Sequence, residues 1–210
     1  LDLKGNPVRE SDGIVYFRTH YYGGIKKYQW TCVPLALIGV IYTKSGKKVE
    51  INIGMKDEDP IFYISDLLIH MAQDQMKKTL AQGITGEQLQ AICATHSEEN
   101  MQAKEVLLKF FKDTYDIEEE DFATAELELV PAMKSRDVGF DRSLIASYGQ
   151  DDRVCSYANL RAILEAKPGM YTQAALLTDK EEIGSYGNTG MESSYFVKVI
   201  MKMLDLQGHT

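Results

Sequence analysis

The sequence has few cysteines, no long apolar run and no excess of positive charge, and each of these features excludes a class of protein. The three cysteines, Cys32, Cys93 and Cys155, are far apart and odd in number, which predicts reduced thiols in a cytoplasmic protein rather than a disulfide framework. No apolar run reaches the roughly 18 residues of a membrane helix. The net charge of −8 argues against binding to nucleic acids or anionic membranes.

The overall composition is that of a globular protein, with 44% hydrophobic and 26% charged residues among 210. A chain of this length buries a substantial core, in one large domain or two smaller ones. No internal repeat is present, which excludes solenoids and propellers. The fold class therefore has to be inferred from the spacing of apolar residues along the chain.

The first half begins with a β pattern. Residues 14–22 and 33–43 are apolar runs, 44–47 is a turn signal, and 48–53 alternates between apolar and polar residues. From Ser65 the spacing becomes helical, with apolar side chains at positions 67, 68, 71, 76 and 80. We expect further helices after Gly86 and over residues 100–115, and a solvated acidic turn over residues 116–121.

The second half alternates between strand and helix patterns, which is typical of an α/β layer. The predicted elements are a strand over 123–130, a helix over 151–166, a strand over 171–177 and a helix over 192–206. We place a domain boundary near residues 121–124. The first domain is expected to be β-rich with helices, and the second to belong to an α/β domain.

Two acidic clusters lie where the chain is expected to change direction: Asp151 with Asp152, and Glu181 with Glu182. Ligands of α/β sheets bind at the carboxyl ends of strands, and adjacent carboxylates destabilise one another unless a positive charge holds them. A pair of divalent metal ions is one explanation. The alternative is structural, with the aspartates capping a helix and the glutamates in a solvated turn. Neither cluster alone decides between them.

Four stretches follow one another along the second half of the chain: Ala125–Ala132, Arg136–Arg142, Tyr148–Tyr157 and Asp179–Met191. Taken in order, they resemble the aminopeptidase I / aspartyl aminopeptidase family of dinuclear zinc exopeptidases. The segment Arg18–Trp30 is similar to the bacterial branch of that family. The resemblance covers essentially all 210 residues.

The resemblance implies a peptidase domain that is interrupted by an inserted dimerisation domain. Residues 1–122 are similar to the insert, and residues 123–210 to the return into the peptidase domain. The implied fold class is α/β, with part of a zinc-exopeptidase α/β sandwich plus an inserted β-rich dimerisation domain with helices. Relatives have a histidine motif before the position of Leu1, and a further aspartate and histidine beyond Thr210. We therefore expect the chain to be the middle part of a protein about twice as long.

The resemblance also assigns roles to three carboxylates. Asp151 matches the aspartate that bridges the two metal ions, and Glu182 matches a ligand of one ion. Glu181 matches the general base, which takes a proton from water and passes it to the leaving amine. The peptide bond between Asp151 and Asp152 is commonly cis in relatives. The family has five protein ligands, and this chain matches two of them.

Among the histidines, His20 is the candidate for a catalytic role. The family's dimerisation domain can project a histidine into the neighbouring subunit's site, and His20 lies among tyrosines and paired glycines. The alternative for His20 is a strand histidine packed against tyrosines. We expect structural or solvated roles for His70 and His96, and no ligand role for His209 on its unpatterned tail.

The activity implied by the resemblance is that of a metalloaminopeptidase, which removes N-terminal residues from peptides with two divalent ions, most plausibly Zn²⁺. Self-association into a homo-dodecamer built from dimers is implied as well, and neither a nucleic acid nor a membrane is expected as a partner. One alternative is a catalytically incomplete fragment that acts only as an oligomerisation or binding module. Another is a related glutamyl or broad-specificity aminopeptidase.

Overall fold

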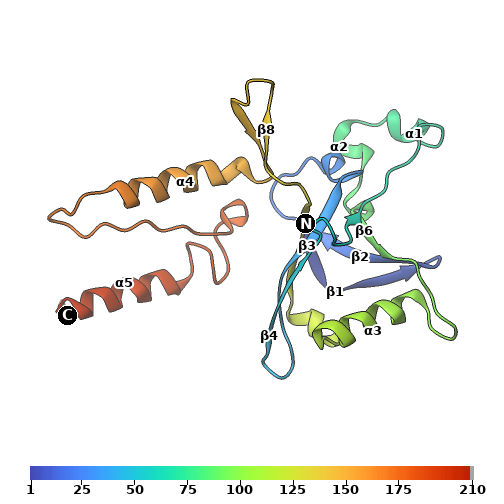
Figure 1. The fold of residues 1–210 in the computed structure, drawn as a ribbon, viewed down its shortest axis with the longest axis horizontal. Helices are drawn as coiled ribbons and strands as arrows, with labels where there is room; N and C mark the ends of the chain where they lie inside the picture. Colours follow the sequence, from blue (N-terminus) through green and yellow to red (C-terminus); the bar gives the residue numbers. More distant parts are fainter. Residues whose placement is uncertain (209–210) are drawn as a thin grey trace. The chain divides into compact units, whose positions relative to one another are not determined.

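The computed structural model describes residues 1–208. It combines sheets with helices (Figure 1), which confirms the predicted mixture of α and β structure. The chain divides into two compact units. The first unit contains Leu1–Tyr21 and Ile25–Ala146, and the second contains Tyr22–Gly24 together with the chain from Ser147 onward. The domain boundary near residues 121–124 stays a prediction.

The first unit is built mainly from strands. They are β1 (Asp2–Ser11), β2 (Ile14–His20), β3 (Pro34–Tyr42), β4 (Lys48–Ile53), β5 (Phe62–Tyr63), β6 (Gln90–Ala94), β7 (Glu126–Pro131), β8 (Arg136–Val138) and β9 (Leu144–Ala146). Because β7 pairs with both β1 and β3, the strands β3-β5-β6-β2-β1-β7 form a closed ring. Strand β4 extends this ring as the hairpin partner of β3, while β8 and β9 form a separate two-stranded sheet.

The β3–β4 hairpin forms where the turn signal predicts it. The Thr43 amide donates to the Lys47 carbonyl oxygen at 3.0 Å, and the strands pair from Tyr42 and Lys48 back to Leu37 and Ile53. Along β4, buried and exposed residues alternate strictly. This confirms one dry and one wet face, as the alternation of apolar and polar residues indicates.

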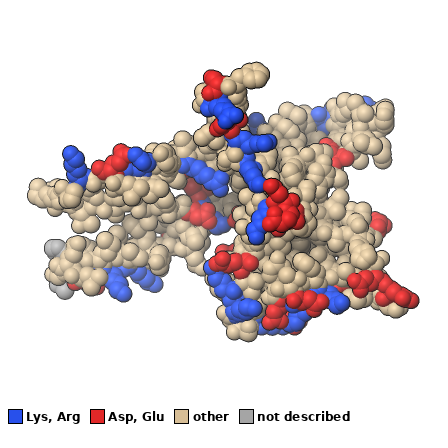
Figure 2. Space-filling model, in the orientation of Figure 1, with Lys and Arg blue, Asp and Glu red and all other residues tan. Residues whose placement is uncertain are grey.

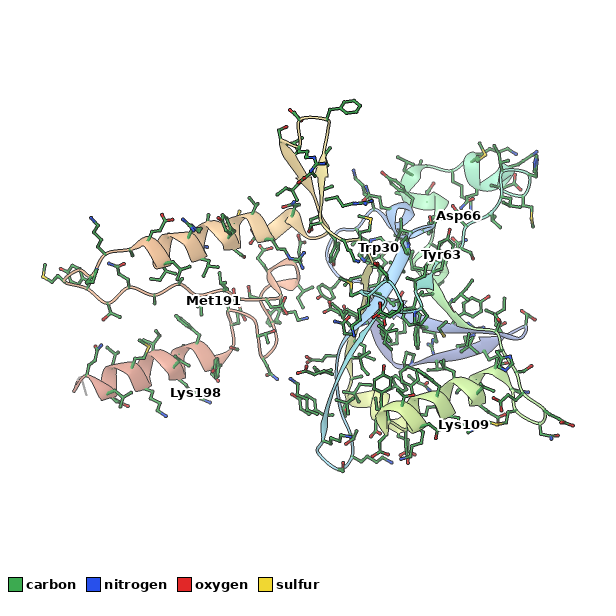
Figure 3. All side chains as sticks on the ribbon, viewed as in Figure 1. Trp30, Tyr63, Asp66, Lys109, Met191 and Lys198 are labelled. Carbon is green, nitrogen blue, oxygen red and sulfur yellow. The ribbon has the colours of Figure 1, made fainter. Side chains whose placement is uncertain are left out.

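The core of the first unit is made mainly of buried side chains from strands β1 to β7, together with Ala103 and Phe111 of helix α3 (Ala103–Tyr115). Phe111 of α3 is buried and meets Phe122 with ring centroids 5.3 Å apart, and Phe17 of β2 meets Phe62 of β5 at 5.4 Å. Lys109 projects from the opposite, exposed side of α3 (Figure 3). The helix predicted over residues 100–115 is therefore confirmed, with an amphipathic packing that follows from its sequence.

Two expectations for the first unit are wrong. The chain after Ser65 forms two short helices, α1 (Gln73–Met76) and α2 (Leu80–Gly83), and the apolar side chains there are exposed. Gly86 begins a 3₁₀ helix, Gly86–Gln88, which leads into strand β6. The acidic run is exposed at Asp116, Glu118 and Glu120, as expected for a solvated turn. Among its acidic residues Asp121 alone is buried, and it accepts hydrogen bonds from the amides of Lys44 and Glu118, both at 2.9 Å.

The second unit contains the two longer helices α4 (Gln150–Glu165) and α5 (Ser194–Leu206), close to the predicted ranges. The segment predicted as a strand over residues 171–177 has no regular secondary structure. Uncharged side chains form most of the visible surface of both helices (Figure 2). The helical spacing over residues 151–166 predicts that Val154 and Leu164 face inward, but both are exposed. None of the helices within residues 1–208 has both the length and the apolar character needed to cross a membrane.

Candidate functional site

The first acidic motif lies at the start of α4. Gly149 precedes the helix in a left-handed conformation, with φ of 72°, and the next residues Asp151 and Asp152 depart from helical angles. The peptide bond between these two aspartates is cis, as the resemblance implies. The Arg153 guanidinium turns back to donate to the Tyr148 carbonyl oxygen and lies 5.8 Å from the Tyr148 ring centre. Asp151 is exposed at this bend.

The second acidic motif is a compact turn in which Glu181 and Glu182 begin the 3₁₀ helix Glu181–Ile183. Lys180 and Gly184 flank it in left-handed conformations, with φ of 70° and 82°. The turn is closed by the Gly184 amide, which donates to the Glu181 carbonyl at 3.0 Å, and by the Ser185 amide, which donates to the Lys180 carbonyl at 2.8 Å. Both glutamate side chains are exposed.

The chain on either side of this turn folds back on itself. The Asp179 amide donates to the Thr189 carbonyl at 3.1 Å, and the Thr189 hydroxyl donates to Asp179 Oδ2 at 3.2 Å. Gly190 is buried here, and the Ser185 carbonyl approaches it so closely that a Cβ at this position would lie 2.0 Å from the carbonyl oxygen. These contacts hold together the two chain segments that flank the acidic turn.

Residues Tyr22–Gly24, distant in sequence, pack against the same turn within the second unit. The Lys180 ammonium donates to the Tyr22 hydroxyl at 3.3 Å, lies 5.5 Å from the centre of the Tyr22 ring, and forms an ion pair with Asp179 at 3.4 Å. Gly23 approaches Glu182, since a Cβ at Gly23 would lie 2.9 Å from Glu182 Oε2 and 3.2 Å from its Cβ. No motif in the sequence assigns Tyr22, Gly23 or Lys180 to the site, although paired glycines beside tyrosines are a signal for close backbone approach.

The charges at the base of the turn stabilise one another. Partial burial disfavours the ammonium of Lys180, but the hydrogen bond to Tyr22 and the nearby Asp179 carboxylate outweigh this and raise the pKa of Lys180. Partial burial also disfavours the Asp179 carboxylate, but a hydrogen bond from the Lys180 backbone and the Lys180 charge lower the pKa of Asp179. Lys180 and Asp179 are therefore both charged at neutral pH.

The carboxylates of Asp151, Glu181 and Glu182 form no hydrogen bond or ion pair with other residues in the range 1–208. Exposed carboxylate oxygens are suitable zinc ligands. The Gly23 backbone lies against Glu182, because a Cβ at Gly23 would come within 2.9 Å of Glu182 Oε2. These residues fit part of a zinc site. The structure brings Glu181 and Glu182 together on one turn, but the described chain contains no group of three or more His, Cys, Asp or Glu residues that could hold a metal ion.

His20 lies in the first unit, at the end of β2 and opposite Asp2 of β1, with its side chain exposed. His70 and His96 are exposed as well, which agrees with solvated roles. His209 lies outside the described residues. The roles of Asp151, Glu181, Glu182 and His20 stay predictions.

Comparisons with known proteins agree on one family. The family model described as "Aminopeptidase I zinc metalloprotease (M18)" matches residues 1–210. A probable M18 family aminopeptidase 1 from Clostridium acetobutylicum is 46% identical over 212 residues, which cover 99% of this chain and 46% of the relative. The crystal structure of an M18 family aminopeptidase from Thermotoga maritima matches with a TM-score of 0.89 and 44% identity, over 100% of this chain and 47% of the other.

A more distant neighbour shares the fold. The structure of the S. cerevisiae mApe1 dodecamer matches with a TM-score of 0.64 and 20% identity, over 97% of this chain and 46% of that one. In each comparison the chain spans about half the length of the protein that it matches.

Proposed function

Because the chain belongs to the aminopeptidase I zinc metalloprotease (M18) family, we propose that it forms part of a zinc aminopeptidase that hydrolyses N-terminal residues from peptides. The observation that carries the proposal is a family match that includes both acidic motifs, together with the exposed carboxylates of the Glu181–Glu182 turn. A purely structural or oligomerisation role is not favoured, since relatives named as aminopeptidases match along the whole chain.

The finer architecture is part of the same proposal. Residues 1–122 would be the inserted dimerisation domain, and residues 123–210 part of a zinc-exopeptidase α/β sandwich. Asp151 would bridge two zinc ions, and Glu182 would bind one of them. When bound, zinc would polarise the scissile carbonyl and stabilise developing negative charge. Each zinc ion prefers about four ligands, so two carboxylates are part of the set.

Glu181 differs from its neighbour in the role that we propose for it. Its carboxylate would accept a proton from the attacking water and then donate that proton to the leaving amine. Adjacent residues on a 3₁₀ turn point in different directions, about 120° apart at three residues per turn. Glu182 can therefore face an ion while Glu181 faces the substrate.

The test compares three substitutions in the full-length enzyme, of which the two Glu→Gln changes are isosteric. Glu181→Gln is expected to keep zinc but lower kcat by about 10²–10⁴-fold, the usual contribution of a general base. Glu182→Gln and Asp151→Ala are expected to lower zinc content instead, measured by elemental analysis after dialysis. Zinc loss in Glu181→Gln with full zinc in Glu182→Gln would reverse the two roles. Full zinc occupancy in Asp151→Ala would exclude a bridging aspartate.

We also propose that the enzyme self-associates into a homo-dodecamer built from dimers, with contacts made by residues 1–122. The support is a set of exposed apolar side chains around α1 and α2, among them Leu68 (71% exposed), Met71 (70%) and Leu80 (72%). His20 would lie near a partner subunit's site. A cytoplasmic location is proposed on the basis of the three free cysteines.

The assembly proposal is tested in the full-length protein with Leu68→Asp and Met71→Asp, which place charges in an apolar contact. We expect both variants to have a lower mass in light scattering, while exposed Lys78→Ala serves as the control. Unchanged assembly of both aspartate variants would show that this segment does not form the contact.

A further inference from the structure

We propose that Tyr22, Gly23 and Lys180 are positioning residues, which hold the Glu181–Glu182 turn in place before zinc binds. This inference rests on the proposed role of Glu182 as a zinc ligand. The segment Tyr22–Gly24 follows β2 and therefore belongs to the proposed insert, yet it packs with the second unit. The insert would then serve the metal site of its own chain, in addition to its role in assembly.

The first contact depends on the absence of a side chain. Gly23 has φ of 67°, a conformation that L-residues rarely adopt, and its missing Cβ would stand 2.9 Å from Glu182 Oε2 and 3.2 Å from Glu182 Cβ. The Gly23 backbone consequently forms a wall against which the Glu182 side chain rests. An added methyl group would have to displace the Glu182 side chain at both its carboxylate and its Cβ.

The second contact fixes the residue that precedes the glutamates. Lys180 has φ of 70°, and its ammonium is held by three groups: the Tyr22 hydroxyl at 3.3 Å, the Tyr22 ring at 5.5 Å and Asp179 at 3.4 Å. Its side chain is 26% exposed, whereas the Asp179 side chain is 61% exposed and is itself held by Thr189. Tyr22 thus anchors Lys180 across 158 positions of sequence.

These contacts matter because a ligand that is already ordered loses less conformational entropy when the metal binds. Residues that orient metal ligands typically contribute 10–100-fold in metal affinity. Replacing Tyr22 or Gly23 by alanine changes no formal charge. Their effect on zinc is therefore one of geometry, and it can be separated from electrostatic attraction or repulsion.

The experiment measures zinc affinity in the full-length protein by competition with a chromophoric chelator, and compares two neighbouring glycines. Gly23→Ala is expected to weaken zinc binding by about 10–100-fold. Gly24→Ala is the matched control, because a Cβ at Gly24 meets no atom within 4 Å, and it should bind zinc like the wild type. Equal affinity of Gly23→Ala and wild type would overturn the proposal.

A second pair of variants leaves Gly23 unchanged, in case its substitution prevents folding. Tyr22→Ala removes both the hydroxyl and the ring beside Lys180, while Tyr22→Phe keeps the ring. We expect Tyr22→Ala to weaken zinc binding and Tyr22→Phe to restore most of the affinity, with unchanged thermal midpoints of the metal-free proteins. Wild-type affinity in Tyr22→Ala would contradict the role of the anchor.

Glu182→Gln distinguishes failure of this inference from failure of the proposed function. If Glu182→Gln loses zinc but Gly23→Ala and Tyr22→Ala retain it, Glu182 is a ligand without these positioning residues. If Glu182→Gln itself binds zinc like the wild type, Glu182 is not a zinc ligand, and the positioning role of Tyr22, Gly23 and Lys180 is excluded as well.

Discussion

Two side chains lie in surroundings that their residue types do not suggest. An aspartate in an acidic run is expected to be exposed to solvent, and a free cysteine is expected to be reactive. Asp121 belongs to an acidic run but is 5% exposed, because its carboxylate accepts the amides of Lys44 and Glu118. Cys93 of β6 is half-buried and donates through Sγ to the Val15 carbonyl at 3.2 Å. Burial raises the pKa of the Cys93 thiol to about 12.

This shift predicts an order of thiol reactivity in the native protein. The thiolate is the nucleophile, so a rise of the pKa from 9.0 to about 12 lowers its fraction at pH 8 by about 10³-fold. We expect Cys93 to be alkylated by iodoacetamide far more slowly than the exposed Cys32, as measured by mass spectrometry of digested samples. Denatured protein, in which both thiols are free, provides the control. Equal rates in the native state would show that Cys93 is accessible and ionised.

The same shift also has a consequence for stability. The folded state binds the Cys93 proton more tightly than the unfolded state, so the stabilising effect is complete below pH 9 and decreases as the pH rises toward about 12. Between pH 9 and about pH 12, the Cys93→Ala variant should therefore lose less of its free energy of unfolding than the wild type.

At the level of elements, the closed sheet depends on one glycine. Gly39 of β3 pairs with both Ile51 and Leu127, and a Cβ at this position would lie 2.0 Å from the Glu126 carbonyl oxygen. The backbones of β3 and β7 are therefore closer than any side chain allows. Its φ of 138° also disfavours L-residues.

Gly39→Ala is accordingly expected to destabilise the protein by about 2–5 kcal/mol, from steric overlap and backbone strain together. The measurement is urea unfolding of the full-length protein, with Gly5→Ala in β1 as the control. A Cβ at Gly5 meets nothing within 4 Å, so that change should be nearly neutral. Equal midpoints for the two variants would mean that β3 and β7 are not this close.

The elements that the sequence predicts well are those whose pattern is local. The β3–β4 hairpin, α3, α4 and α5 lie close to their expected ranges because a turn signal or a helical spacing defines each of them. Strands β1 and β6 escape prediction because non-local pairing stabilises them, with β2 in both cases and with β7 for β1. After Ser65, by contrast, a longer helix is predicted than the structure contains, and its apolar side chains are exposed. Apolar spacing indicates a face that can be buried, but it cannot show which partner covers that face.

The candidate site also has a part that local sequence predicts and a part that it does not. The two acidic motifs and the cis peptide at Asp151 follow from short sequence motifs and their family resemblance. The contact of Tyr22 and Gly23 with Lys180 and Glu182 does not, because it joins positions about 160 residues apart that no local pattern relates.

At the scale of the whole molecule, the second unit leaves large apolar side chains exposed. Leu164 of α4 is 70% exposed, and Tyr195 and Leu206 of α5 are 71% and 80% exposed. Large exposed apolar patches are rare on monomeric proteins and mark surfaces that other segments cover. Since the chain spans about half of its relatives, we expect these faces to pack against the other half of such a protein.

This leads to a prediction for a polypeptide of these 210 residues made alone. Its uncovered helix faces should cause association, seen as polydisperse, high-mass species in light scattering and as strong binding of a hydrophobic dye. It should also fail to hydrolyse peptides. Residues 1–208 contain no group of three potential ligands, whereas zinc prefers about four.

The full-length protein is the control for both measurements, and intact mass must confirm that the shorter sample holds 210 residues. Association and inactivity have separate causes, so their outcomes are informative independently. A monodisperse sample would show that α4 and α5 cover their own apolar faces in solution. Aminopeptidase activity in that sample would show that Asp151 and Glu182 work with a ligand set contained within this chain, and would refute the ligand set implied by the family.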